Sequence, residues 1–326
     1  MRAVALGVFL CLAAIAAHAE TPPAPQAKSI AKDVWLIPGG FLPDRQPDGN
    51  TVIFDGPKGL IVMDTGRHLW QRQAILDFAK AHHKPIAAIV NSHWHLDHVS
   101  GNPDLKRAYP GAKVFASNAI DDALTGFLAR SAKGAEDYLK SGDVPADTAE
   151  DIRNDIATWK NGGALKPDVV VSKSATRTIA GKSLQVNLAP NAATDGDVWV
   201  YDPASKVVAT GDLVTLPAPF LDTACPKGWS DALSLVESTP FTTAIPGHGA
   251  PMTRADIATY HKAFDAFIAC AASDRDAKEC AEGWAKDAGA LLGSDEATQK
   301  KAKGMAMYYA KDVLRAHGGK SAECKA

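Results

Sequence analysis

Short apolar runs separated by turn residues fill the chain from residue 34 to residue 90. Four runs have the length and composition of buried strands: residues 34–37, 51–54, 60–63 and 86–90. Turn residues lie between them, notably Gly39 and Gly59. In segment 69–83 the apolar residues instead recur at helical spacing. The pattern therefore predicts strands that lead into a strand–helix–strand unit.

The rest of the chain alternates between helical stretches and further strands. Residues 117–162 have helical spacing and predict a helical insertion, which lies either over a site or at the periphery. Strand-like runs return in four places: residues 169–171, 184–188, 198–201 and 207–209. From residue 253 to residue 326 the pattern is helical, with a capping residue at Thr253 and a stop at Gly318. This mixture predicts an α/β fold with a helical C-terminal extension.

Metal-ligating residue types are concentrated directly after the run 86–90. The segment NSHWHLDH places His93, His95, Asp97 and His98 on one short stretch. Imidazole and carboxylate are the ligands that zinc and related metals prefer in proteins. Buried polar groups need partners, so four of them cannot all enter a dry core. The segment predicts a metal site at the end of a strand, with a histidine-rich surface loop as the alternative.

This segment resembles the HxHxDH motif of the metallo-β-lactamase fold superfamily. Four other segments resemble later family motifs in the right order: GLIVMDTG at 59–66, TDGD at 194–197, VVATGD at 207–212 and IPGHG at 245–249. The resemblance covers about residues 30 to 252. It implies a four-layer αββα sandwich for residues 20–252. It also implies six metal ligands: His93, His95, Asp97, His98, Asp212 and His248.

One residue departs from the family pattern. Most members have a histidine immediately before the TDGD turn, where this chain has Ala193. No histidine lies between His98 and His248, so a shifted histidine cannot replace it. The amide oxygen of Asn191 is a poor zinc ligand compared with imidazole. The resemblance therefore implies two metal positions with unequal ligand sets.

One position has more protein ligands than the other, and their number matches that of a catalytic zinc site. Its ligands are Asp97, His98 and His248, with Asp212 able to reach either metal. The other position keeps His93 and His95 but lacks a third histidine. We expect one tightly bound Zn²⁺ and a second position that is weak or empty.

The resemblance implies a metal-dependent hydrolase. Bound zinc lowers the pKa of its water from about 15.7 to roughly 7 and so supplies hydroxide, with Asp97 as the catalytic residue that orients it. An amide or ester bond is the expected target, with β-lactams and lactones as candidates. A phosphodiester hydrolase of the same fold and a non-catalytic metal-binding relative remain alternatives.

Residues outside the motif can support the site or line it. Asp64, in the family's Asp-Thr-Gly turn, is expected under the histidine loop, where it can accept hydrogen bonds from ligand rings. Five other residues are candidates for the pocket wall: His68, Trp70, Phe220, Lys227 and Trp229.

Composition narrows the partners. The chain has 35 basic and 37 acidic residues, and this balance argues against nucleic acid. A small-molecule substrate is expected, and the helical tail leaves a homo-oligomer open. Residues 1–19 have a basic start, an apolar core and an Ala-His-Ala end, which predicts a cleaved signal peptide. No later apolar run approaches the roughly 20 residues of a membrane helix.

Four cysteines follow the predicted cleavage site. An even number in an exported chain predicts disulfides, with free buried thiols as the alternative. We expect Cys270 to pair with Cys280 and Cys225 to pair with Cys324. Together with the signal peptide, this predicts a periplasmic or secreted protein.

Overall fold

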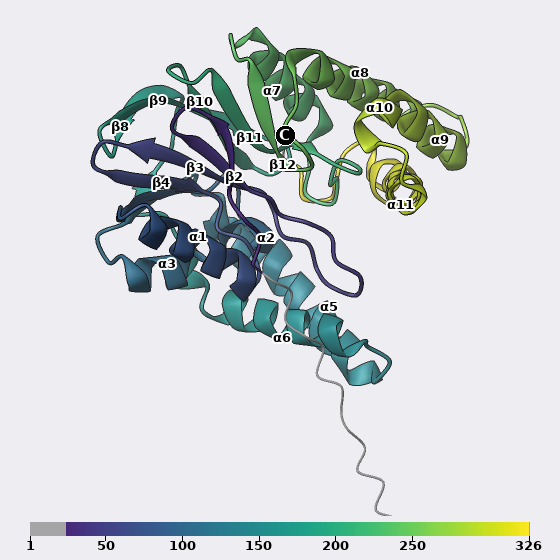
Figure 1. The fold of residues 1–326 in the computed structure, drawn as a ribbon. Helices are drawn as coiled ribbons and strands as arrows, with labels where there is room; N and C mark the ends of the chain where they lie inside the picture. Colours follow the sequence, from purple (N-terminus) through teal and green to yellow (C-terminus); the bar gives the residue numbers. More distant parts are fainter. Residues whose placement is uncertain (1–23, 326) are drawn as a thin grey trace, which may run out of the picture.

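The computed structural model describes residues 24–325. Two β-sheets face each other, and helices cover the outer face of each sheet (Figure 1). This arrangement confirms the α/β fold and the sandwich expected from the motifs. The predicted signal peptide, residues 1–19, lies outside the described residues.

The first sheet has seven strands within the described residues. Their order follows the sequence: β1 Lys28–Ala31, β2 Val34–Ile37, β3 Thr51–Gly56, β4 Gly59–Met63, β5 Ile86–Val90, β6 Lys113–Ala116 and β7 Val169–Val170. Strands β1 to β4 pair antiparallel, and β4 to β7 pair parallel. The sequence pattern identified all of these strands except β1 and β6.

The second sheet has five strands among residues 24–325. Their order is β12 Thr243–His248, β11 Val207–Thr215, β10 Gly196–Asp202, β9 Lys182–Pro190 and β8 Ala175–Ile179. Only the pairing of β11 with β12 is parallel. The carboxyl ends of β11 and β12 therefore lie side by side, with Asp212 and His248 on adjacent strands.

The sandwich buries both faces of its central strands. In β3, Val52 and Phe54 point into the core between the sheets, while Ile53 points to the outer face of the first sheet. In β10, Val200 faces the inter-sheet core and Trp199 faces the helices on the other side. Strands covered on both faces are apolar at nearly every position, which explains the continuous runs in the sequence.

Three helices follow the first strands: α1 Leu69–Ala81, α2 Leu96–Val99 and α3 Asn102–Ala108. Helix α1 packs Ile75 and Phe78 against the outer face of the first sheet. Helices α2 and α3 are separate, and Gly101 is the N-cap residue of α3. The histidine motif therefore follows β5 and runs into the short helix α2, which contains Asp97 and His98.

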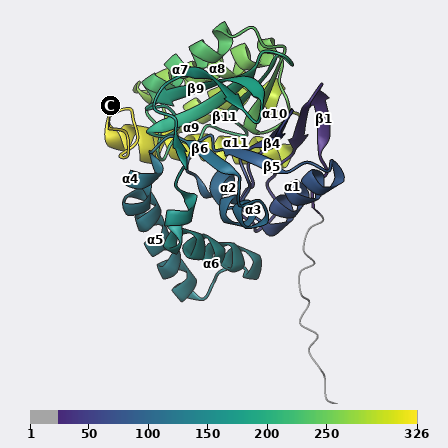
Figure 2. The same ribbon diagram turned by 90° about the vertical axis from the view of Figure 1, so that its left-hand side faces the viewer.

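The predicted insertion is helical. It contains α4 Ile120–Thr125, α5 Phe127–Ser141, α6 Ala146–Lys160 and a 3₁₀ turn, Gly162–Leu165. Figure 2 shows α5 and α6 side by side, projecting from the sandwich beyond α2.

The helices of the second half cover the other sheet. They are α7 Pro226–Ser238, α8 Arg254–Ala271, α9 Ala277–Asp287, α10 Gly289–Leu292 and α11 Glu296–Tyr308, followed by a π turn, Tyr309–Leu314, and a 3₁₀ turn, Arg315–His317. Thr253 and Asp256 form the expected capping box of α8. Gly318 ends the last turn in the left-handed conformation, as predicted.

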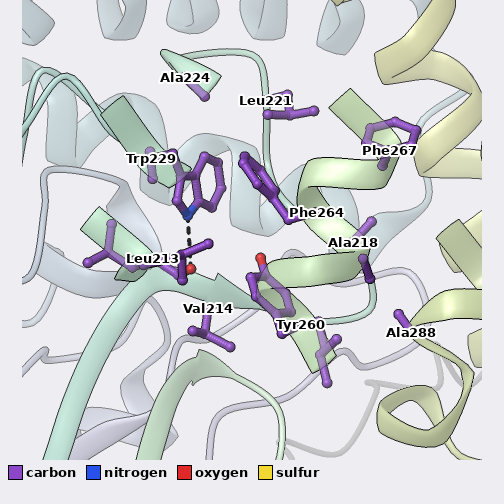
Figure 3. Packing of buried hydrophobic residues seen from close by; sticks show 14 of the residues in the cluster. Leu213, Val214, Ala218, Leu221, Ala224, Trp229, Tyr260, Phe264, Phe267 and Ala288 are labelled. Carbon is purple, nitrogen blue, oxygen red and sulfur yellow. Dashed lines mark hydrogen bonds between the residues drawn. The ribbon is translucent and has the colours of Figure 1, made fainter. Parts of the chain in front are cut away.

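Aromatic packing joins this helical layer to the sheet. Trp229 is fully buried and donates a hydrogen bond from Nε1 to the carbonyl of Leu213 in β11, at 2.8 Å (Figure 3). The rings of Trp229 and Phe264 lie 5.0 Å apart, with Tyr260 in the same cluster. The prediction that Trp229 and Lys227 lie on substrate-facing loops was wrong, because both belong to α7. Lys227 is exposed there and pairs with Asp231.

Both predicted disulfides are present. Cys270–Cys280 joins α8 to α9, and Cys225–Cys324 ties the start of α7 to the end of the chain. No helix within residues 24–325 has both the length and the apolar character needed to cross a bilayer.

Candidate metal centre

The histidine motif approaches the second sheet where two glycines leave room. A Cβ atom on Gly49 would lie 2.4 Å from the ring of His98, and one on Gly247 would lie 1.9 Å from Oδ1 of Asp212. Side chains at these positions would displace the ligands. The backbone is therefore shaped around the histidine and aspartate side chains.

One group of ligand atoms consists of Asp97, His98 and His248. The Nε2 atom of His248 lies 3.0 Å from Oδ2 of Asp97 and 3.3 Å from Nε2 of His98. The Nε2 atom of His98 lies 3.6 Å from the same carboxylate oxygen. All three side chains are buried. We call this group the Asp97 position; it contains the three ligands expected for the tighter site.

A second group contains His93, His98 and Asp212. The carboxylate of Asp212 lies between the two rings, 3.3 Å from Nε2 of His98 and 3.8 Å from Nε2 of His93. The buried atoms His93 Nε2 and Asp212 Oδ1 have no hydrogen-bond partner among the described residues. Unsatisfied buried acceptors are costly, so two on side chains of one group of ligand residues fit a cation between them. The donor set, imidazole and carboxylate, suits zinc.

Asp64 supports both groups from below. Its Oδ2 atom lies 2.8 Å from Nδ1 of His98 and accepts a hydrogen bond from the Ser92 hydroxyl at 2.7 Å. That hydroxyl lies 2.8 Å from Nδ1 of His93. The Oδ1 atom of Asp64 also accepts a hydrogen bond from the backbone N–H of Ser92. Ring nitrogens held in this way direct Nε2 toward a metal.

His95 is held differently. It belongs to neither group of ligand atoms among the described residues, and its Nε2 atom lies 3.1 Å from the hydroxyl of Thr223. That hydroxyl donates a hydrogen bond to the carbonyl of Ala193 at 2.8 Å. The oxygen atom of the Thr223 hydroxyl can therefore accept a hydrogen bond from the His95 ring. Thr223 therefore connects His95 to Ala193, the position where the family histidine is missing. We call His95, Thr223 and Ala193 the His95 position.

The electrostatic environment shifts the pKa values of the ligand residues in different directions. Burial opposes ionisation of Asp97, but His98 and His248 outweigh it and hold the carboxyl pKa well below its usual range. Burial disfavours a charged His98, yet Asp212, Asp97 and Asp64 raise the pKa of that ring well above its ordinary value. Burial lowers the pKa of His95 to about 4. A metal ion would replace the proton that the carboxylates favour on His98.

A cavity of about 460 Å³ opens over the cluster. His95, Asp97, Asp212 and His248 lie at its floor. Its walls are largely apolar. The insertion and the C-terminal helical segment contribute Phe127, Leu128, Ile152, Ile156, Trp159, Met305 and Tyr309, while Trp94 of the histidine motif and Phe220 of the segment between β11 and α7 complete them. The insertion therefore lines the site, which decides between the two placements that the sequence left open.

Three cations line the same cavity: Arg45, Arg67 and Lys301. Arg45 pairs with three carboxylates of α6, the nearest of them Asp151 at 2.7 Å. Burial disfavours the charge of Arg67, but Asp155, Asp97 and Asp48 outweigh it and raise the guanidinium pKa. Lys301 is exposed at the rim, with its ammonium 3.8 Å from the centre of the Phe41 ring.

Other candidates from the sequence lie elsewhere. Phe220 does line the cavity, with its ring 4.9 Å from that of His95. His68 and Trp70 stack on each other outside this cavity, and His68 lies between Asp48 and Asp151. Sequence reasoning missed Arg67, Thr223 and Lys301. Only Arg67 had a local indication, because it directly follows the Asp-Thr-Gly turn.

Comparison with known proteins agrees with this geometry. The sequence pattern of the family described as the metallo-beta-lactamase superfamily matches residues 45–248. A linear primary-alkylsulfatase from Pseudomonas sp. is 25% identical over 225 residues, 62% of this chain and 41% of its own length. An (R)-specific secondary-alkylsulfatase from Pseudomonas sp. is 29% identical over 219 residues, again 62% of this chain and 32% of its own. The chain thus spans less than half the length of either curated relative.

A solved structure extends the likeness to the helices. A doubly substituted sec-alkyl sulfatase PisA1 is similar over 90% of this chain and 50% of its own, with a TM-score of 0.57 and 19% sequence identity. At this identity the likeness concerns the fold alone.

Proposed function

The chain belongs to the metallo-beta-lactamase superfamily, and from that premise we propose that it is a zinc-dependent hydrolase of sulfate esters that carry an apolar chain. The observation that carries the proposal is the largely apolar cavity above the His/Asp cluster, with Lys301 at its rim. The two alkylsulfatases among its relatives support the choice of ester.

The charges of the cavity support an anionic substrate. Arg45 and Arg67 already face carboxylates, so their charge is largely compensated. Lys301 has no acidic partner within ion-pair distance among residues 24–325. A sulfate ester offers a negative charge to this ammonium and an apolar chain to the walls. A neutral lactam or lactone uses only the second feature.

The roles of the residues follow from the geometry. Asp97, His98 and His248 would hold a zinc ion, with Asp212 and His93 facing it from the other side. When bound, zinc supplies a Lewis acid and an acidified water. Asp97 and Asp212, the carboxylates of the cluster, would orient the attacking water. The apolar walls hold the alkyl chain and exclude bulk water. We also propose that the second metal position is weaker, because Thr223 engages His95.

A substrate panel tests the proposal. Octyl, decyl and dodecyl sulfate would be compared with decyl acetate, a chromogenic β-lactam and a phosphodiester, before and after metal depletion. We expect metal-dependent sulfate release with KM falling as the chain lengthens. Each buried methylene contributes about 0.8 kcal/mol, or about fourfold in KM, until the cavity is full. Preferred hydrolysis of the β-lactam, or metal-independent turnover, would contradict the proposal.

The contribution of Lys301 has a matched control on the same helix. Lys301→Met should raise KM for decyl sulfate by about three- to tenfold, since a charge-assisted contact contributes about 1 kcal/mol at an exposed site. KM for decyl acetate should not change. Lys300→Met removes an exposed neighbouring charge and should leave both values unaltered. Equal changes in KM for decyl sulfate in the two lysine variants would show that the overall charge of the helix, and not Lys301 itself, affects substrate binding.

We further propose that the protein works outside the cytoplasm. The apolar N-terminal segment and the two disulfides support this location. Mass spectrometry of protein from its native host should find a mature chain that begins near Glu20. An intact Met1 on soluble cytoplasmic protein would contradict it.

A further inference from the structure

We propose that Arg67 and Asp155 are positioning residues through which the helical insertion fixes the carboxylate of Asp97 for metal binding. This inference rests on the zinc-dependent function proposed above. It assigns a role to a pair of side chains outside the metal-binding motif, one of them in the insertion helix α6.

Arg67 is anchored on several sides. Its side chain is 11% exposed, and its Nε atom donates a hydrogen bond to the carbonyl of Pro47 at 3.0 Å. Nη1 bonds the carboxylate of Asp155. Nη2 lies 3.7 Å from Oδ1 of Asp97. The guanidinium is thus held between a carboxylate of the insertion and a carboxylate of the metal loop.

The two oxygens of Asp97 face different partners. Oδ2 points to the imidazoles, 3.0 Å from Nε2 of His248 and 3.6 Å from Nε2 of His98. Oδ1 faces the guanidinium of Arg67. A cation on one side and two imidazoles on the other define the rotation of the carboxylate. Outer partners of this kind orient metal ligands and raise metal affinity.

Asp155 keeps this cation at a distance. A buried guanidinium without a counter-ion would close onto Asp97, form a direct ion pair and compete with the metal for that carboxylate. The bond to Asp155 takes up much of the charge and leaves Nη2 at 3.7 Å, near Asp97 but outside hydrogen-bond distance. The carboxylate of Asp97 therefore stays available to a metal.

The insertion helix is fixed firmly enough for this role. One turn before Asp155, the buried carboxylate of Asp151 bonds Arg45 at 2.7 Å and lies 3.1 Å from Nε2 of His68. It also accepts the backbone N–H of Gln46 at 2.8 Å. Two carboxylates on one face of α6 thus attach the helix to segments on either side of the Asp-Thr-Gly turn.

The chain contains a matched control pair. Arg72 and Asp104 form an ion pair of 2.8 Å with side chains 14% and 25% exposed, close to the 11% and 22% of Arg67 and Asp155. This pair joins α1 to α3, and neither residue lines the cavity over the cluster. It has the same chemistry and similar burial without the contact to Asp97. Because Nη2 of Arg72 also bonds the backbone carbonyl of Arg67, Asp104→Asn is the decisive control.

The test is a double-mutant cycle read out by metal affinity. Zinc affinity would be measured by competition with a chromophoric chelator for wild type, Arg67→Met, Asp155→Asn and the double variant. Absorption spectra of the cobalt(II) forms would report ligand geometry, and thermal unfolding would report folding. Arg72→Met and Asp104→Asn are the controls, and Arg67→Lys tests rescue.

We expect Arg67→Met to weaken the tight zinc equivalent by about 10- to 100-fold and to alter the cobalt spectrum. Asp155→Asn should act in the same direction, and the double variant should be no worse than Arg67→Met, since the residues act as one unit. Arg67→Lys should recover part of the loss. Both control variants should stay within about twofold of wild type.

Three results would overturn the inference: unaltered affinity in Arg67→Met, additive losses in the double variant, or an equal loss in Asp104→Asn. If Arg67→Met does not fold, Asp155→Asn decides alone, because it replaces one atom of a partly exposed side chain. Failure of wild type itself to bind zinc would overturn the proposed function as well. Normal wild-type binding with unaltered variants would overturn only this inference.

Discussion

Asp97 and His95 lie two residues apart where helix α2 begins, yet the Asp97 position and the His95 position are held by different contacts. Around Asp97 the contacts are ionic, with Arg67 on one side and two imidazoles on the other. Around His95 they are neutral, with the Thr223 hydroxyl and the ring of Phe220. His93, Asp97 and His98 of one motif thus face other ligand atoms, while His95 contacts Thr223. We therefore expect the residues opposite each ligand, and not the ligand type alone, to decide how strongly each position binds a metal.

The largest expected effect is on the Asp97 position. His248→Ala removes an imidazole that lies 3.0 Å from Asp97, and it should abolish the tight zinc equivalent. Losing several kcal/mol of transition-state stabilisation corresponds to on the order of a 10³-fold fall in kcat/KM. Zinc titration and sulfate release measure the two effects. His317→Ala, an exposed histidine in the last helical turn, is the control. If His248→Ala still bound zinc tightly, the Asp97 position would not be the tight site, and the distinction between the two positions would fail.

Restoring the histidine that is missing at residue 193 should narrow the difference in zinc affinity between the two metal positions. Ala193 is 1% exposed and its carbonyl bonds Thr223, so the variant Ala193→His needs the space that Thr223→Ala provides. In this double variant we expect the second metal equivalent to tighten at least about tenfold, or about 1.4 kcal/mol. Isothermal titration with zinc measures it. Unaltered stoichiometry and affinity would show that residue 193 does not face the second position.

A smaller effect is expected at the His95 position, where the contacts are neutral. Thr223→Val keeps the shape of the side chain but leaves the carbonyl of Ala193 without its donor. An unsatisfied buried acceptor costs about 1 to 3 kcal/mol, so the unfolding free energy in urea should fall by about that amount. Thr242→Val, at an exposed threonine whose hydroxyl also bonds a carbonyl, is the control and should change little. No loss in Thr223→Val would mean that water or another group satisfies the carbonyl.

The smallest effect is expected at His68, whose ion pairs should make the stability of the protein depend on pH. Burial opposes the charge on His68, but Asp151 and Asp48 outweigh it and raise the ring pKa. A raised folded-state pKa stabilises the protein fully below the unfolded value, about 6.5, and the contribution is lost as pH rises through the folded value. The stability difference between wild type and His68→Gln should therefore be largest in mild acid and shrink above neutrality. Urea unfolding at a series of pH values measures it, and a difference that grows with pH would contradict the assignment.

Local sequence pattern identified more of the fold than of the site. Helix α7 was missed although its indications were present, with Pro226 in the first turn and apolar Trp229, Leu233 and Val236 at helical spacing. The short strand β6 was missed because four residues carry little periodicity. The ligand residue types were all visible in the motifs, since their chemistry does not depend on the neighbours.

Local spacing and side-chain chemistry were enough to predict the strand-forming runs, the metal-ligating residue types, the missing histidine at residue 193 and the pairing of Cys270 with Cys280. The packing of the chain, by contrast, brings His95 to Thr223, 128 positions further along, and Arg67 to Asp155, 88 positions away. Contacts of this kind depend on how the sheets and the insertion pack, and hydrogen bonds between distant residues leave no periodic pattern in the sequence. The unequal environments of the two metal positions arise from these contacts.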